Sequence, residues 1–167
     1  MGRIYKIEKY LFLFIITLFI SNINAADFKD SLIQPGVGVG VLKLGDTPVD
    51  ISRKLEGKKA DIAKKIVYDS TVEMWLSYVD MGVTLIYDTN KSIKSIIVTN
   101  KELLLEESGI HVGSAKSNVL KNYKGEKRPI RQINNNIELW EYPDLGIIFF
   151  VNITKELVDS IKVIPKR

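Results

Sequence analysis

Short apolar runs, many of them alternating with polar residues, make up most of the chain after residue 60, and turn-forming residues separate them. Runs rich in Val, Ile, Thr and aromatic residues predict β-strands, because these side chains fit a pleated, half-buried surface. The eight strands that the pattern predicts are 64–68, 71–79, 83–87, 93–99, 129–133, 137–142, 147–151 and 158–164. The links inside each group of four are of hairpin length, so neighbouring strands are expected to be antiparallel.

A short helix is predicted ahead of each group of strands. In the first, Thr47 or Asp46 can cap a helix that begins at Pro48, and Asp50 is close to the capping-box position. Gly57 then ends it.

The second helix is predicted to open at Ser114 and to end before Gly125. Each helix has one narrow apolar stripe that can pack on a sheet, formed by Ile51 with Leu55 and by Val119 with Tyr123.

The two helix-and-strand groups match each other in sequence. Residues 44–51 match 112–119 at an offset of 68, and Glu73-Met74-Trp75 matches Glu138-Leu139-Trp140 at an offset of 65. The match continues from 78–83 to 142–147 at an offset of 64. Self-similarity over this length predicts an internal repeat.

The predicted fold class is therefore α+β: two tandem helix-plus-antiparallel-strand repeats form one continuous sheet, and the short helices lie on one of its faces. We place an N-terminal segment at 26–34, the first repeat at 35–100 and the second at 103–165, packed as one domain.

This order of elements resembles the tandem-repeat β-lactamase-inhibitor-protein family, and a single unit resembles the SmpA/OmlA type of outer-membrane-assembly lipoprotein. The residues that carry the resemblance are Leu44-Gly45-Asp46-Thr47, Ile51, Leu55, Trp75, Tyr78 and Gly82, with Val112-Gly113-Ser114, Val119, Tyr123, Trp140, Tyr142 and Gly146. The chain departs from both families in having no cysteine, for a disulfide or for lipidation. The resemblance implies the shared fold and a protein that binds other proteins and catalyses nothing.

The change of offset between the two aromatic pairs predicts a local defect. Trp140 and Tyr142 are two residues apart, whereas Trp75 and Tyr78 are three apart. If both pairs share one face of the sheet, a β-bulge is required at about Leu76 or Ser77.

The N-terminus has the order of a secretory signal: basic residues up to Lys9, an apolar stretch 10–20, and small residues before Asp27. Eleven apolar residues are too few for a membrane-spanning helix, which needs roughly 20. We therefore expect residues 1–25 to be a cleavable signal peptide of the bacterial Sec type, and the rest to be periplasmic or secreted without a transmembrane anchor.

Charge and cysteine content narrow the function classes. Residues 1–25 hold three basic residues and one acidic residue, so 21 basic and 19 acidic side chains remain after them. Because the basic residues are largely scattered among acidic ones, we expect no nucleic-acid partner. With no cysteine, the fold must be held by its core alone.

The catalytic inventory is small, so an enzyme is not the expected function. His111 is the single histidine and lies just before the second helix, where a solvated or capping role is the simpler interpretation. Gly36 to Gly40 lacks the spacing and the Lys-Ser/Thr ending of a phosphate loop, so close packing or a bulge is favoured. We expect no cofactor. We also expect no metal site, because the acidic residues follow no calcium-loop pattern.

The strand 147–151 is apolar on both faces, yet helices can cover only one face of a one-layer sheet. If Ile147, Phe149 and Val151 face the helices, Ile148 and Phe150 face away from them. The alternative is that the strand is buried on both faces, by the curl of the sheet or by the segment 28–33. The candidate anchors for a protein partner on the uncovered face are Trp75, Tyr78, Trp140, Tyr142, Ile148 and Phe150.

The sequence thus predicts an exported, non-enzymatic protein that binds another envelope or extracellular protein, as an assembly factor or an inhibitor, or that binds a second copy of itself. A small-ligand-binding module and a carboxylate-dependent hydrolase are the alternatives. Convergent carboxylates in a cleft would favour the hydrolase, and an aromatic patch would favour the binder.

Overall fold

A computed structural model describes residue 28 and residues 31–68, 71–123, 131–134 and 136–167. The predicted signal peptide, residues 26–27 and 29–30 of the predicted N-terminal segment and the predicted helix stop at Gly125 lie outside these residues. No helix in the described ranges combines the length and the apolar character needed to cross a membrane.

The main structure is an antiparallel sheet of eight strands, made from two consecutive four-strand meanders. In spatial order the strands are β4 (Ile62–Tyr68), β5 (Thr71–Tyr78), β6 (Val83–Tyr87), β7 (Ile93–Val98), β12 (Leu157–Val163), β11 (Ile147–Asn152), β10 (Ile137–Tyr142) and β9 (Arg131–Asn134). The predicted α+β class and all eight strands are confirmed, with ends displaced by one or two residues.

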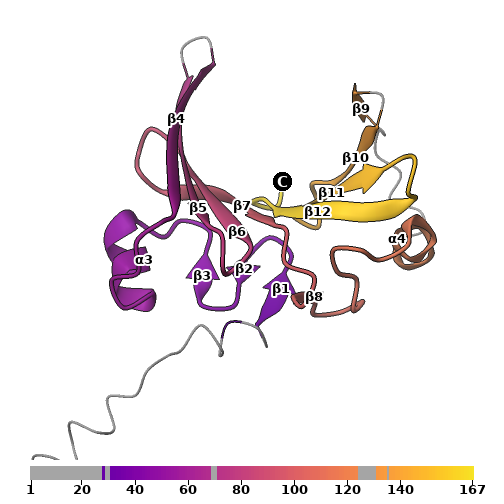
Figure 1. Cartoon of the computed structure of the whole chain (residues 1–167), viewed down its shortest axis with the longest axis horizontal. Coiled ribbons are helices and arrows are strands. Elements are labelled where there is room, and N and C mark those ends of the chain that lie inside the picture. Colours follow the sequence, from indigo (N-terminus) through magenta and orange to yellow (C-terminus); the bar gives the residue numbers. More distant parts are fainter. Residues whose placement is uncertain (1–27, 29–30, 69–70, 124–130, 135) are drawn as a thin grey trace, which may run out of the picture.

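The last strands of the two meanders, β7 and β12, join the halves. They pair antiparallel, with Ile97 opposite Lys162 at the centre of the register. Figure 1 shows β4 and β5 rising on one side of this junction and β9 and β10 on the other, so that the sheet curves away from both helices.

A second, small sheet was not predicted. It has the order β3 (Leu42–Lys43), β2 (Gly38–Val39), β1 (Leu32–Gln34) and β8 (Leu104–Leu105), with β1 and β8 parallel. It lies on the same side of the large sheet as the helices (Figure 1). The segment around Gly36 to Gly40 is therefore strand and turn, in keeping with the packing role expected for its glycines.

The first helix, α3 (Pro48–Lys54), has the predicted start. The Thr47 hydroxyl accepts a hydrogen bond from the Asp50 backbone N–H at 3.3 Å, and the Asp50 carboxylate accepts one from the Thr47 N–H at 2.9 Å. This pair is a complete capping box. Gly57, with φ +78°, donates to the Ser52 carbonyl just beyond the helix end.

The second helix, α4 (Lys116–Asn122), begins two residues after Ser114, where it was predicted to open. Its N-cap is Ala115, which offers no side-chain hydrogen bond. The Ser114 hydroxyl instead accepts from the His111 backbone N–H at 3.0 Å, so Ser114 closes the preceding turn.

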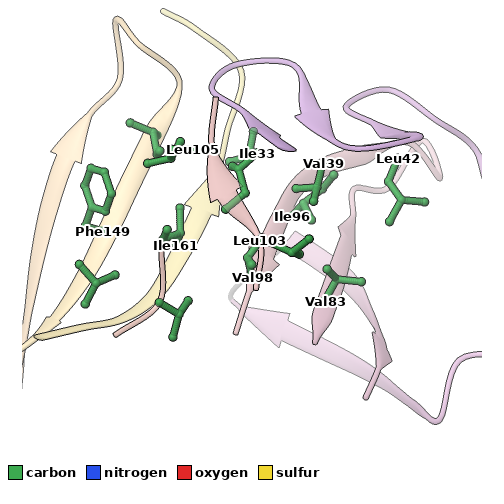
Figure 2. Close-up of a cluster of buried hydrophobic side chains, with 14 of the residues drawn as sticks. Ile33, Val39, Leu42, Val83, Ile96, Val98, Leu103, Leu105, Phe149 and Ile161 are labelled. Atoms are coloured by element: carbon green, nitrogen blue, oxygen red, sulfur yellow. The ribbon is translucent and has the colours of Figure 1, made fainter. Parts of the chain in front are cut away.

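The core lies between the large sheet on one side and the helices and small sheet on the other. Figure 2 shows Ile33, Val39 and Leu42 of the small sheet facing side chains of the large one. The large-sheet residues labelled there are Val83, Ile96, Val98, Phe149 and Ile161, all buried. Ile51 and Val119 carry the helices into the same cluster.

The predicted bulge at Leu76 or Ser77 is wrong. The ladder from β5 to β6 runs unbroken from Met74 to Tyr78. The premise fails because Trp75 and Tyr78 do not share a face: odd spacing in an unbroken strand puts them on opposite sides of the sheet. Register shifts occur elsewhere, between Ile86 and Tyr87 and between Phe150 and Val151, and leave Lys94 and Asp159 as the extra residues opposite them.

Candidate functional site

The face of the large sheet opposite the helices is the candidate site. We call it the open face and define it by residues that alternate with core residues along their strands: Glu73, Trp75, Ile86, Ser95, Ile97, Ile148, Phe150 and Lys162. Ile86 and Ser95 are buried, and the other six are partly exposed. In β11 the alternation is complete, because Ile147, Phe149 and Val151 are buried and Ile148 and Phe150 are partly exposed. No described helix or strand packs over this face (Figure 1).

The structure divides the six predicted anchor residues between the two faces. Trp75, Ile148 and Phe150 are partly exposed on the open face. The other three, Tyr78, Trp140 and Tyr142, are buried in the core cluster on the helix side. The tyrosine ring of Tyr142 packs against Tyr123 and Phe149, with centroids 4.9 and 5.9 Å apart. These three cannot contact a partner in this structure, because their strand register turns them inward.

Trp75 is part of a polar cluster on the open face. Its indole Nε1 donates to the Glu73 carboxylate at 2.8 Å, and the Lys94 ammonium forms an ion pair with the other oxygen of that carboxylate. Burial acts to raise the pKa of Glu73, but the hydrogen bonds from Lys94 and Trp75 outweigh it and hold the pKa below its usual value. Glu73 is therefore ionised at neutral pH, and it fixes the indole.

The second half has the same three side-chain types on the other face. Trp140 Nε1 donates to Glu138 at 3.1 Å, and Lys116 Nζ of α4 lies 3.4 Å from that carboxylate and 5.4 Å from the indole centroid. This arrangement fixes helix α4 to the sheet. The Glu-x-Trp pattern therefore has an exposed version in the first half and a structural version in the second.

A pocket of about 360 Å³ opens on the open face beside the junction of β7 and β12. It is lined by Lys94, Ser95, Glu141, Pro143, Ile148, Lys162, Ile164, Pro165 and Arg167. This volume is within the range of small-molecule pockets, roughly 300–1,000 Å³.

Lys162 is the most unusual ionisable residue of this pocket. Burial lowers the pKa of its ammonium group, and repulsion from Lys94 adds to the effect, although Glu73 and Glu141 oppose it. A lysine in a sheet centre with a destabilised charge is a feature that binding sites often have.

The hydrogen-bond partners of His111 are neighbouring residues of its own loop, Val112 and Ser114. Its Nδ1 lies 2.9 Å from the Val112 carbonyl oxygen, and its backbone is held by Ser114. Among the residues the structure describes, no three histidine, aspartate or glutamate side chains group closely enough to hold a metal ion.

Sequence reasoning missed Lys94, Ser95, Lys162 and Arg167 as site residues. The available signal was a lysine inside an apolar strand, as in Ile161-Lys162-Val163, where alternation places the charge on the face opposite the core. Their convergence could not be read from the pattern, because it depends on β7 and β12 being neighbours.

The fold and the open face define a class: an α+β protein built on a curved antiparallel sheet with one face free. The structure of the uncharacterized protein YfeY from Escherichia coli is similar, with a TM-score of 0.55 and 12% identity over 80% of this chain and 98% of that one. An extracellular protein containing an SCP domain, from Bacillus anthracis str. Ames, is similar with a TM-score of 0.50 and 9% identity over 73% of this chain. The match spans 44% of that protein's chain.

These similarities at low identity show the fold alone. Neither protein is described as a β-lactamase-inhibitor protein or an SmpA/OmlA lipoprotein. No family model matches the sequence. No curated protein matches it.

Proposed function

We propose that this chain is an exported, non-enzymatic protein that binds another envelope or extracellular protein through the open face. The observation that carries the proposal is the partly exposed set Trp75, Ile148 and Phe150 on a sheet face that the described helices leave free. Aromatic side chains, tryptophan and tyrosine above all, are enriched among the few residues that contribute most of the binding energy of protein–protein interfaces.

The two halves are, in this proposal, tandem repeats. In the first half Gly45 N–H donates to Ile93 O at 2.8 Å and Ile93 N–H donates to Asp46 O at 2.9 Å. Gly113 and Ser114 make the matching bonds with Val158, at 2.7 and 2.9 Å. Helix bounds that differ by 68 at both ends, and register shifts at matching positions of β6 and β11, support the same interpretation.

Export, to the periplasm or the outside, is supported by the signal-like pattern of residues 1–25 and by the likeness to an extracellular protein. The role as an envelope assembly factor or an inhibitor rests on the sequence resemblance to those families. A second copy of this chain is an alternative occupant of the open face.

A carboxylate-dependent hydrolase finds less support than a binding protein. Glycosidase-type chemistry needs one carboxyl group whose pKa is raised so that it can donate a proton. Glu73, a carboxylate of the open face, has its pKa shifted the other way.

The proposal is tested by affinity capture from envelope extracts, with the chain from residue 26 onward as bait. The test variant is Trp75→Ala/Phe150→Ala on the open face. The matched control is Val49→Ala/Leu120→Ala, which removes two side chains exposed on the helices, 67% and 51% exposed. We expect one specific protein to be captured by the native chain and the control and lost with the test variant.

Three results would count against the proposal. Equal capture by all three baits would place the interface elsewhere. Capture of no protein, together with hydrolytic turnover by the purified chain, would replace the binder with an enzyme. A dimer in light scattering that the test variant dissociates would make the partner a second copy.

A further inference from the structure

The pocket on the open face combines an apolar wall with a charged wall. Pro143, Ile148, Ile164 and Pro165 supply the apolar side, and Lys94, Lys162, Arg167, Glu141 and Ser95 supply the polar side. Small-molecule sites typically have this composition, in which an apolar surface takes the body of the ligand and a few polar groups orient it.

The cations of the pocket are not equally available. Lys94 is already paired with Glu73. Among the described residues, the side chains of Lys162 and Arg167 have neither a hydrogen bond nor an ion pair within 4 Å. Glu141 is the one acidic side chain in the lining, so the side chains there carry three positive charges and one negative charge.

Ser95 gives an independent sign of a missing partner. Its side chain is 1% exposed, and its hydroxyl has no hydrogen-bond partner in the described structure. A buried hydroxyl without a hydrogen-bond partner is unfavourable. Ser95 lines the pocket, so a turn of its side chain toward a ligand oxygen there would give the hydroxyl a partner.

We propose that this pocket binds a carboxylate carried on a small apolar group. The carboxylate accepts charge-assisted hydrogen bonds from Lys162 and Arg167 and one from the Ser95 hydroxyl, and the apolar group packs on Ile148 and Ile164. This site goes beyond the protein-binding proposal, because its occupant is defined by a small chemical group.

The proposal has a pH dependence with a definite sign. In the free protein, burial and the neighbouring Lys94 lower the pKa of Lys162, with Glu73 and Glu141 opposing and Arg167 also lining the pocket. A bound carboxylate favours the charged ammonium, so it raises that pKa and binding takes up protons. Affinity should therefore fall as the pH rises through the pKa of Lys162 toward its usual value of 10.5.

The probe is 3-phenylpropanoate, with the uncharged 3-phenylpropanamide as its isosteric comparison. Binding to the full chain is followed by NMR shifts of the backbone amides of residues 94–95 and 162. We expect saturable shifts with the acid and binding at least about tenfold weaker with the amide, because the amide lacks the negative charge that strengthens hydrogen bonds from Lys162 and Arg167.

The test variant is Lys162→Gln and the control is Lys101→Gln, which makes the same charge change at an exposed position outside the pocket. We expect about tenfold weaker binding, without the pH dependence, for Lys162→Gln and native affinity for Lys101→Gln. A second test variant is Arg167→Gln, because Arg167 is exposed and lies outside the strands of the sheet.

The bound carboxylate has two possible sources, and a peptide distinguishes them. The peptide is acetyl-Ala-Ala-Phe with a free C-terminal carboxylate. Tighter binding of this peptide than of the free acid indicates a protein chain end, and binding of the free acid alone indicates a small molecule. The proposal is overturned if neither the acid nor the peptide binds with a Kd below 10 mM (about 2.7 kcal/mol of binding free energy). It is also overturned if acid and amide bind equally, or if Lys101→Gln loses as much affinity as Lys162→Gln.

Discussion

Trp75 and Trp140 occupy opposite faces of one sheet, although both follow a glutamate by two residues and bond to it through the indole nitrogen. Trp140 is 3% exposed in the core, whereas Trp75 is partly exposed on the open face. The shared Glu-x-Trp pattern therefore has two different energetic roles, and the face of the sheet on which it lies decides which one applies.

Truncation of the two indoles should separate these roles. Trp140→Ala is expected to lower the free energy of unfolding by about 3–5 kcal/mol, as is usual for a large core side chain. Trp75→Ala should cost about 1 kcal/mol, since it removes a partly solvated ring. Urea unfolding of both variants measures this, and equal losses would contradict the assignment of faces.

Glu73 gives a prediction about how the stability of the fold depends on pH. Its pKa in the folded chain lies below the usual value of 4.5, because the hydrogen bonds from Lys94 and Trp75 outweigh burial. A lowered carboxyl pKa contributes stability that is present above the unfolded pKa and is lost as the pH falls through the folded one. The stability difference between the native chain and Glu73→Gln should thus shrink as the pH falls from about 4.5 downward. A difference that stays constant in urea titrations from pH 7 to pH 3 would show that Glu73 contributes no such linkage.

At the scale of elements, the connection between the small sheet and the large one depends on a close backbone approach. Gly146 in the turn between β10 and β11 has φ +77°, and its carbonyl accepts a hydrogen bond from Gly36 N–H at 3.1 Å. A Cβ on Gly146 would lie 2.3 Å from the Gly36 Cα. Gly45 has a similar φ, +88°, but a Cβ there would meet no atom within 4 Å.

Gly45→Ala therefore measures conformational strain, and Gly146→Ala measures strain plus a clash. We expect a loss of about 1–2 kcal/mol for Gly45→Ala. Gly146→Ala should lose roughly 1–3 kcal/mol more, because backbone must move. Thermal or urea unfolding measures both losses of stability. Equal losses for Gly45→Ala and Gly146→Ala would contradict a clash at Gly146.

The elements that the sequence predicted are those whose signal is local. Alternation and turn residues mark every strand of the large sheet, and Thr47, Pro48 and Asp50 mark the start of α3. The small sheet was missed because strands of two or three residues have no measurable period. The inward orientation of Tyr78 and the pocket around Lys162 were missed because they depend on register and on the pairing of β7 with β12, which are contacts between distant segments.

At the scale of the molecule, the halves share one core. Buried residues of both meanders, the helices and the small sheet belong to a single cluster, and β7 pairs directly with β12. Neither half can keep its core surface buried without the other. We therefore expect the chain to unfold in one transition.

Single-tryptophan variants test this cooperativity. Trp140→Phe leaves Trp75 as a fluorescent probe of the first half, and Trp75→Phe leaves Trp140 as a probe of the second. Within each variant, the urea transition by fluorescence should coincide with that by far-ultraviolet circular dichroism. Separate midpoints within one variant would mean that the halves unfold independently.

The central claim, that the open face receives a protein partner, is tested most directly by site-specific photo-crosslinking in cells that produce the protein. A photo-reactive phenylalanine replaces Trp75 or Phe150 on the open face, or Val49 or Leu120 on the exposed sides of the helices. The account predicts one discrete crosslinked protein from positions 75 and 150 and none from positions 49 and 120. Crosslinks from the helix positions alone, or no crosslink from either open-face position, would contradict it.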